Sequence, residues 1–182
     1  MTIESLEVSG YRSAFEALRL PYGLEPRSHT YGPMRDYNQE TNCLTYGARV
    51  YVDYDDMELM KDLVKCGDEH AKILRGIVVH ARICAPVYFF SELETYRAGH
   101  ERLASESTMH IDCKGLSGDE LVKAKAAIPM GRELMKIDMF SYQCLRNIYR
   151  QRKNHRLPQW HQFCQWIETL PFAAKLITLG LK

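Results

Sequence analysis

The spacing of apolar residues predicts a helix in the first third of the chain. Apolar residues between Met57 and Lys65 recur three or four positions apart, which is the period of an amphipathic helix. Asp55 and Asp56 precede this run and are suited to cap it, and Gly67 provides a stop. We therefore expect a capped helix over residues 57–65.

Two further helices are expected near the ends of the chain. Ser13–Leu20 reads as a short helix that Pro21 stops. A longer one is predicted to begin at Pro158 and to end before Pro171. Its buried face is expected to consist of Trp160, Phe163, Cys164 and Ile167.

The middle of the chain carries three more helix signals. Pro86 suits a helix start, and the helix is expected to run to about Arg97. Ser117-Gly118-Asp119-Glu120 has the pattern of a capping box, which places another helix start at Ser117. A longer helix is predicted after Gly131, with an inner stripe of Leu134, Ile137, Ser141, Leu145 and Ile148.

Strand signals are fewer. Ile77–Ile83 is β-branched and alternating, and Arg49–Tyr54 alternates enough for a short strand. Residues 22–47 are rich in turn formers and are expected to form an irregular loop. We predict one helix-rich α+β domain over residues 1–182, with a small mixed or antiparallel sheet. Such a small sheet leaves apolar surface that homo-oligomerisation would cover.

Composition narrows the functional classes. With 24 basic and 23 acidic residues the net charge is +1, so neither nucleic acid nor a membrane is expected as a partner. The chain shows no signal-peptide pattern and no apolar run of membrane-spanning length, which predicts a cytoplasmic protein. Its six cysteines form no C-x-x-C pair, and no metal, Walker, dinucleotide or G-x-S-x-G motif is present.

The segment from Ala81 to His110 is the most informative one. A predicted helix changes abruptly at Thr95-Tyr96-Arg97 into a polar stretch that ends in Ser105-Glu106-Ser107-Thr108-Met109-His110. Polar side chains in this number suit a ligand-binding turn. An exposed loop whose serines satisfy their own backbone is the alternative.

This segment resembles the signature region of flavin-dependent thymidylate synthases, the ThyX family. That region has a proline-started helix, Arg-His-Arg, seven residues, a serine, one residue and an arginine. Thr95-Tyr96-Arg97 falls at the triplet, Ser105 at the serine and Ser107 at the arginine. A shifted alignment would place His100-Glu101-Arg102 at the triplet, with His110 and Asp112 at the later positions.

The resemblance covers roughly residues 50–172 and is closest to a divergent, often phage-encoded branch. That branch has E-x-D/E-T-Y-K/R and S-x-S-T-M-H, which match Glu92–Arg97 and Ser105–His110. The run from Asn147 to His155 resembles the family's helix that ends in an arginine and a polar loop, and Gln159-Trp160 resembles its Gln-Trp pair.

The resemblance implies a ThyX-like fold and a homotetramer with shared sites in the cytoplasm of a bacterium or a phage-infected host cell. It implies that reduced FAD carries a one-carbon unit from methylenetetrahydrofolate to C5 of dUMP or a related pyrimidine nucleotide, with NADPH as reductant. The cofactor supplies the difficult chemistry, and the protein supplies orientation and charge. The alternative is a catalytically altered or inactive relative that acts as a nucleotide-binding or structural oligomer.

Site residues follow from the resemblance and from the polar clusters. Ser105 and Arg97 are the catalytic candidates. The flavin-binding candidates are Thr95, Tyr96, Arg97, His100 and His70, although His70 also suits an apolar helix face. The candidates for binding nucleotide are Glu92, Arg102, Ser105, Ser107, His110, Arg146, Arg150 and Arg152. The last three could equally form a solvated basic face near a helix C-terminus.

Overall fold

The computed structural model describes residues 1–22, 35–38, 43–46 and 52–181. Helices and strands are interspersed along this part of the chain, and the last three elements are helices. In order, the elements are β1 (Thr2–Ser9), α1 (Tyr11–Arg19), the 3-10 helix η1 (Leu20–Tyr22), β2 (Arg35–Asn38), β3 (Cys43–Tyr46), α2 (Tyr54–Cys66), the 3-10 helix η2 (Lys72–Arg75), β4 (Val78–Pro86), α3 (Val87–Leu93), β5 (His100–Ser105), α4 (Gly118–Ala127), β6 (Glu133–Ser141), α5 (Tyr142–Arg152), α6 (Pro158–Thr169) and α7 (Ala173–Leu176).

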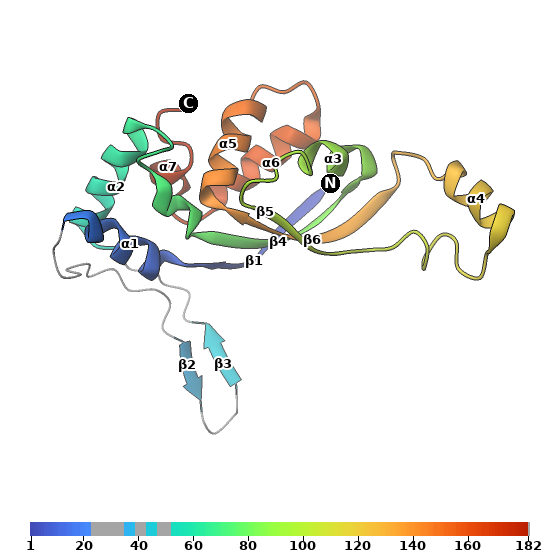
Figure 1. Ribbon diagram of the computed structural model, residues 1–182, viewed down its shortest axis with the longest axis horizontal. Helices are drawn as coiled ribbons and strands as arrows, with labels where there is room; N and C mark the ends of the chain where they lie inside the picture. Colours follow the sequence, from blue (N-terminus) through green and yellow to red (C-terminus); the bar gives the residue numbers. More distant parts are fainter. Residues whose placement is uncertain (23–34, 39–42, 47–51, 182) are drawn as a thin grey trace.

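A four-stranded antiparallel sheet carries the helices. Its strand order is β1-β4-β6-β5, so β6 pairs with β4 on one side and with β5 on the other. Asp138 on β6 stands opposite Ala81 on β4 and Arg102 on β5. Helices α3, α5 and α6 lie over one face of this sheet (Figure 1). The α+β class expected from the sequence is confirmed.

The core lies between the sheet and these helices. Along β4, Val79, Ala81, Ile83 and Ala85 are buried and point to one face, as the two-residue period of a strand requires. Aromatic rings of α3 and α6 pack above them, with the Phe89 and Trp160 centroids 4.7 Å apart. The predicted buried face of the last helix is confirmed at Trp160, Phe163, Cys164 and Ile167.

The long helix predicted after Gly131 is wrong. Strand β6 occupies the first part of that segment, and helix α5 begins only at Tyr142. The buried positions of β6 are Leu134, Lys136, Asp138 and Phe140. Because two of these inward residues are charged, the two-residue alternation does not show as an apolar pattern in the sequence.

Several boundaries also differ from the predictions. Helix α3 ends at Leu93, not near Arg97, and the stretch expected to be a polar turn forms strand β5 from His100. Strand β1 was not predicted either. Both β1 and β5 lie at the sheet edges. Most of their residues are exposed, so the alternation of apolar and polar residues that marks a half-buried strand is weak in the sequence.

The helix predicted over residues 57–65 is longer and has a different cap. The Asp53 carboxylate accepts hydrogen bonds from the backbone N–H groups of Asp55 and Asp56, at 3.0 and 3.4 Å. The expected helix over 13–20 is present as α1, and the helix after Ser117 is present as α4. However, Ser117 makes no side-chain capping bond, so the capping box is not formed.

The predicted irregular region over residues 22–47 contains the antiparallel strand pair β2 and β3, and its first residue, Tyr22, ends η1; the rest of it lies outside the described residues. The strand expected over residues 49–54 also falls partly outside them. In its described part, Tyr54 already begins helix α2, so a strand there is wrong.

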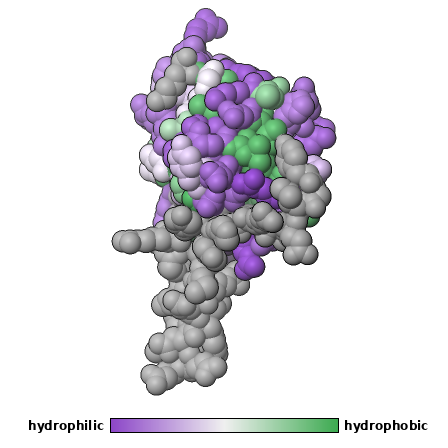
Figure 2. Space-filling view, turned by 90° about the vertical axis from the view of Figure 1, so that its left-hand side faces the viewer, coloured by the Kyte–Doolittle hydropathy of each residue, from purple (hydrophilic) through white to green (hydrophobic). Residues whose placement is uncertain are grey.

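An arm between β5 and β6, residues 106–132, extends away from the body and carries α4 (Figure 1). Helix α4 has no buried residue. Large apolar side chains are exposed along the arm and the adjoining strands, namely Leu103, Met109, Ile111, Leu116, Val122, Met130 and Met135. At the opposite end of the molecule, around α1 and α2, hydrophilic side chains dominate around a smaller hydrophobic area (Figure 2).

Candidate functional site

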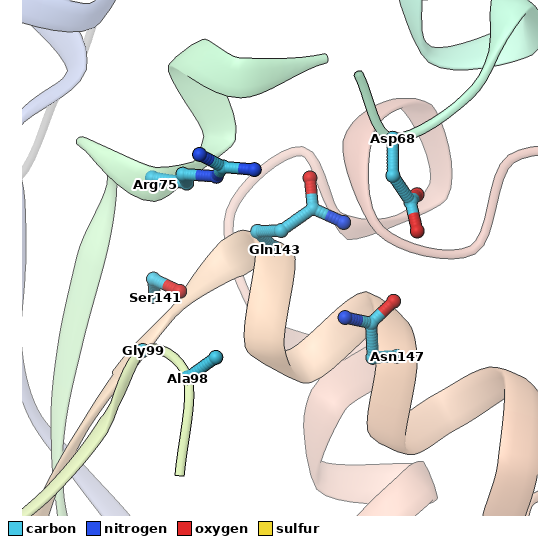
Figure 3. A pocket seen from close by; sticks show the side chains of 7 residues that line it. All are labelled: Asp68, Arg75, Ala98, Gly99, Ser141, Gln143 and Asn147. Atoms are coloured by element: carbon cyan, nitrogen blue, oxygen red, sulfur yellow. The ribbon is translucent and has the colours of Figure 1, made fainter. Parts of the chain in front are cut away.

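A cavity of about 520 Å³ lies where the start of α5 meets the α3–β5 connection, residues 94–99. Its volume falls within the range typical of ligand pockets. Five of its seven lining residues have polar or charged side chains, and Figure 3 shows the side chains gathered around it. We call it the amide pocket; it is lined by Asp68, Arg75, Ala98, Gly99, Ser141, Gln143 and Asn147.

Gln143 is the distinctive group of the amide pocket. Its side chain is buried, with 7% of the residue exposed, and neither Oε1 nor Nε2 has a hydrogen-bond partner among the described residues. In Figure 3 its carboxamide lies between the guanidinium of Arg75 and the carboxylate of Asp68. A buried polar group without a partner costs free energy, so a side chain kept in this state points to a ligand that completes its hydrogen bonds.

Helix α5 and the α3–β5 connection fix the walls of this pocket. Ser141 caps α5, since its hydroxyl accepts a hydrogen bond from the Cys144 backbone N–H at 3.1 Å. The Ser141 backbone N–H in turn donates to the Gly99 carbonyl at 2.7 Å. Gly99 has φ +79°, a conformation that favours glycine. The helix therefore begins at the pocket and places Gln143 on its first turn.

The α3–β5 connection also borders a second cavity of about 350 Å³. We call it the charged pocket; it is lined by Glu94, Arg97, His100, Glu101 and Arg102. Two cations of the predicted site, Arg97 and Arg102, thus come together here. The predicted flavin-binding His100 lies in the same pocket.

Glu94 organises the wall of the charged pocket. Its Oε1 accepts hydrogen bonds from Lys136 Nζ at 2.6 Å and from Arg102 Nη1 at 2.7 Å. Burial raises the pKa of Glu94, but the Lys136 hydrogen bond and the charges of Lys136, Arg102 and His100 outweigh it, so the pKa is lowered overall. The carboxylate therefore stays ionised and neutralises Lys136 and Arg102. The Arg97 side chain, by contrast, has no hydrogen bond or ion pair within the described ranges; the backbone N–H of Arg97 donates to the Thr95 carbonyl at 3.1 Å.

Phe140 and Asp138 are the neighbours that hold the His100 ring in place. His100 is buried, its ring stacks on Phe140 with centroids 4.6 Å apart, and its Nε2 lies 3.5 Å from Asp138 Oδ1. At this distance the imidazole ring and the carboxylate attract one another, but the contact is long for a hydrogen bond. Accordingly, His100 Nε2 and Asp138 Oδ2 are without hydrogen-bond partners in the described part of the chain.

Three of the predicted site residues form a structural cluster beside the pockets. Arg152 donates to Tyr96 Oη at 2.8 Å and to Glu92 Oε2 at 3.1 Å, and Trp160 Nε1 donates to the same Glu92 oxygen at 2.9 Å. The guanidinium also lies over the Trp160 ring, 4.6 Å from its centroid. These contacts tie the α3–β5 connection to α5 and α6 and thereby shape the pocket walls.

The remaining basic candidates do not converge on one surface. Arg146 donates to the carbonyls of Ile177 and Leu179, at 2.8 and 2.9 Å, and so holds the C-terminal segment. Arg150 lies 3.3 Å from Asn147 Oδ1 and 3.7 Å from Asp68 Oδ2, at the edge of the amide pocket. Arg150 therefore contacts two residues that line the amide pocket, whereas Arg146 serves the C-terminal segment.

The other predicted residues lie on the surface. Thr95 and Ser105 are exposed and bond to nearby backbone carbonyls. Ser107 is half-buried, and His110 is exposed on the arm. His70 was expected on an apolar helix face, but it is exposed in a turn between α2 and η2, which corrects that expectation.

Sequence reasoning found three residues of the charged pocket, Arg97, His100 and Arg102, but missed those that build the amide pocket. Asp68, Arg75, Gln143 and Asn147 line the amide pocket. The available signal was Gln143, a polar residue set among apolar positions at the start of α5. Asp138 gave a similar signal, but the false helix prediction placed it outside the apolar stripe.

The fold has counterparts among solved structures. Two structures of the flavin-dependent thymidylate synthase ThyX from Helicobacter pylori, both with FAD and dUMP, match the whole chain over their whole length with a TM-score of 0.69 and 12% identity. A UMP/dUMP methylase, PolB from Streptomyces cacaoi, bound with 5-Br dUMP, has a TM-score of 0.61 and 12% identity over 96% of this chain and 90% of its own. No family model and no curated protein matches the sequence.

The chain therefore shares its fold with the Helicobacter pylori synthase and with the Streptomyces cacaoi methylase. More particularly, the chain has a ThyX-like fold, as its signature segment predicted. Across the described residues, every helix is too short or too polar to cross a membrane.

Proposed function

We propose that this protein is a flavin-dependent enzyme that transfers a one-carbon unit to C5 of a pyrimidine nucleotide, dUMP or a relative. The observation that carries this proposal is the unpartnered, buried Gln143 amide in a cavity beside the ThyX-like signature segment. The ThyX-like fold and the FAD and dUMP held by the Helicobacter pylori enzyme support it.

The amide pocket suits the polar part of a flavin. Gln143 offers a donor and an acceptor, Asn147 adds a second amide, and Arg75 adds a positive charge beside the start of helix α5. Helix N-termini and arginines both favour anionic groups such as phosphates. When bound, a reduced flavin would supply the hydride and the carbon-transfer chemistry. The side chains of this chain would bind and orient it and exclude water from the pocket.

The charged pocket suits the anionic end of a nucleotide. Arg97 has no ion pair in the described part of the chain, and Arg102 faces the same cavity. We propose that Arg97 binds the phosphate, taking the part that the family's missing arginine would play at Ser107. We propose that Ser105, the last residue of strand β5, is a catalytic residue, as the resemblance implies.

The proposal extends to the partners that the resemblance implies. Methylenetetrahydrofolate would be the carbon donor and NADPH the reductant, in the cytoplasm of a bacterium or phage-infected cell. The active form would be a homotetramer. The exposed apolar residues of the arm support oligomerisation, because a helix without a buried residue gains stability only from packing against another surface.

A second candidate is a relative that binds nucleotide but has lost the flavin chemistry. The observation in its favour concerns Tyr96, at the second position of the signature triplet. Its hydroxyl accepts a hydrogen bond from Arg152 and donates one to Gln151, so it is already used within the protein and is not free to bind a ligand. Binding of dUMP without any flavin requirement would identify this form.

The decisive experiment is reconstitution with FAD. The purified protein is mixed with FAD and separated from the free cofactor, and its visible absorption and fluorescence are recorded. A bound flavin, followed by conversion of dUMP to a methylated product with NADPH and methylenetetrahydrofolate, supports the enzyme. A colourless protein that dUMP nevertheless stabilises against heat supports the second candidate.

A further inference from the structure

Two charged residues occupy inward positions of strand β6. Lys136 and Asp138 alternate with Leu134 and Phe140 on the helix-covered face, and both are buried. Charges at such positions are unfavourable unless they are paired. Lys136 is paired with Glu94. Asp138 faces only His100, with one carboxylate oxygen lacking a hydrogen-bond partner within the described ranges.

His100 is fixed in orientation by its neighbours. Its ring lies parallel to the Phe140 ring, at an interplanar angle of 6°, and Asp138 stands at Nε2. A carboxylate at one ring nitrogen favours the tautomer that carries its proton there. The opposite nitrogen, Nδ1, is then a hydrogen-bond acceptor. Since Nε2 is buried and His100 borders the charged pocket, Nδ1 is the nitrogen that remains for a ligand.

We propose that Asp138 is a positioning residue that holds His100 as the Nε2–H tautomer, and that His100 Nδ1 accepts a hydrogen bond from an N–H group of a ligand in the charged pocket. This inference rests on the proposed function for its ligand class, a nucleotide with an imide N–H, as in uracil. The phosphate would lie with Arg97 and the base edge with His100. The 3.5 Å separation would shorten on binding, as hydrogen bonds at catalytic sites often do.

The first test measures the tautomer directly and needs no ligand. Nitrogen-15 NMR of the full chain at about pH 8.5, where an ordinary imidazole is neutral, distinguishes a protonated from an unprotonated ring nitrogen. We expect His100 to carry its proton at Nε2 in the native protein, and to lose this preference in Asp138→Leu. A proton at Nδ1 in the native protein, or an unchanged tautomer in a folded Asp138→Leu variant, would overturn the proposal.

The second test separates ligand contact from structural support with a matched pair of variants. His100→Asn places a polar atom near the Nδ1 position and leaves Asp138 without a partner. His100→Gln reaches towards Asp138 but leaves the Nδ1 position empty. We expect His100→Gln to weaken dUMP binding, measured by calorimetry, about three- to tenfold more than His100→Asn, the loss of one hydrogen bond. The reverse order would show that His100 only supports the sheet.

The outcomes distinguish this inference from the proposed function. If the native protein binds neither FAD nor dUMP, the proposed function is contradicted. The NMR measurement of the His100 tautomer still tests, independently, whether Asp138 positions His100. Native protein that binds dUMP, but whose Nδ1 signal does not respond to saturating dUMP, overturns the ligand contact and leaves the proposed function intact.

Discussion

The backbone of Gly99 lies directly against the side chain of Ser141. A Cβ atom added at Gly99 would stand 2.2 Å from Ser141 Oγ, far inside any normal contact distance. The same serine caps α5 and donates its backbone N–H to the Gly99 carbonyl. The connection that carries the signature segment is therefore locked to the start of the helix that carries Gln143.

Replacing this glycine should destabilise the protein. Gly99→Ala combines a positive φ with a steric clash, and we expect a loss of about 2 kcal/mol or more in the free energy of unfolding, measured with urea. Gly115→Ala is the matched control, because Gly115 has φ +80° but nothing within 4 Å of the added Cβ. Equal losses in the two variants would show that the contact with Ser141 is unimportant.

Replacing Gln143 should weaken ligand binding without destabilising the ligand-free protein. In Gln143→Leu the unpartnered amide is replaced by an apolar group of similar size, so the ligand-free protein should melt at the same temperature or higher. The increase in melting temperature that FAD produces should shrink or vanish. Thermal unfolding with and without FAD measures both effects. A variant that loses stability but keeps the full FAD response would contradict a ligand role for this amide.

Glu94 should make stability dependent on acid pH. Its pKa is lowered in the folded state, so its contribution is present above the ordinary carboxyl range and is lost as the pH falls through the lowered value. Glu94→Gln should therefore be less stable than the native protein near neutrality, and the difference should close below about pH 4. Urea unfolding from pH 3 to 7 follows this difference, and a gap that stays constant over that range would argue against the ion pairs.

Buried and exposed cysteines should differ strongly in their reactivity toward an alkylating reagent. Burial raises the pKa of the Cys144 thiol to about 12, and burial together with the charge of Glu168 raises that of Cys164 to about 12. Since the thiolate is the reactive form, both should resist iodoacetamide in the native protein, whereas the exposed Cys66 should be alkylated readily. Peptide mass spectrometry locates the labels, and labelling in urea provides the control in which all these thiols react.

The arm should contribute to assembly. Val122 is 65% exposed on α4, and Val122→Glu places a charge on the apolar surface that we propose another copy covers. The variant should show a smaller mass in solution by light scattering than the native oligomer. Lys123→Glu, a charge change at the next exposed position of the same helix, should leave the mass unchanged. A native protein that is already monomeric would contradict the proposed assembly.

The sequence was most informative where helices bury one continuous apolar stripe. The buried face of α6 follows from Trp160, Phe163, Cys164 and Ile167 because no charge interrupts the helical period. The signature segment likewise predicted the ThyX-like fold, although its residues match the family pattern only at Arg97 and Ser105.

Strand β6 was hidden for the opposite reason. Lys136 and Asp138 stand where a buried strand normally has apolar residues, and their partners Glu94 and His100 come from the other side of the arm. Pairing between residues so distant in the chain cannot be deduced from local spacing. The same limit applies to the amide pocket, whose walls come from η2, the α3–β5 connection and α5.

The α3–β5 connection forms part of both cavities, with Ala98 and Gly99 towards one and Glu94 and Arg97 towards the other. Two ligands that both contact this one connection share its conformational freedom, so whichever binds first removes some of the entropy that the second would lose. The affinities of the two ligands must then change by the same factor, whichever is titrated first.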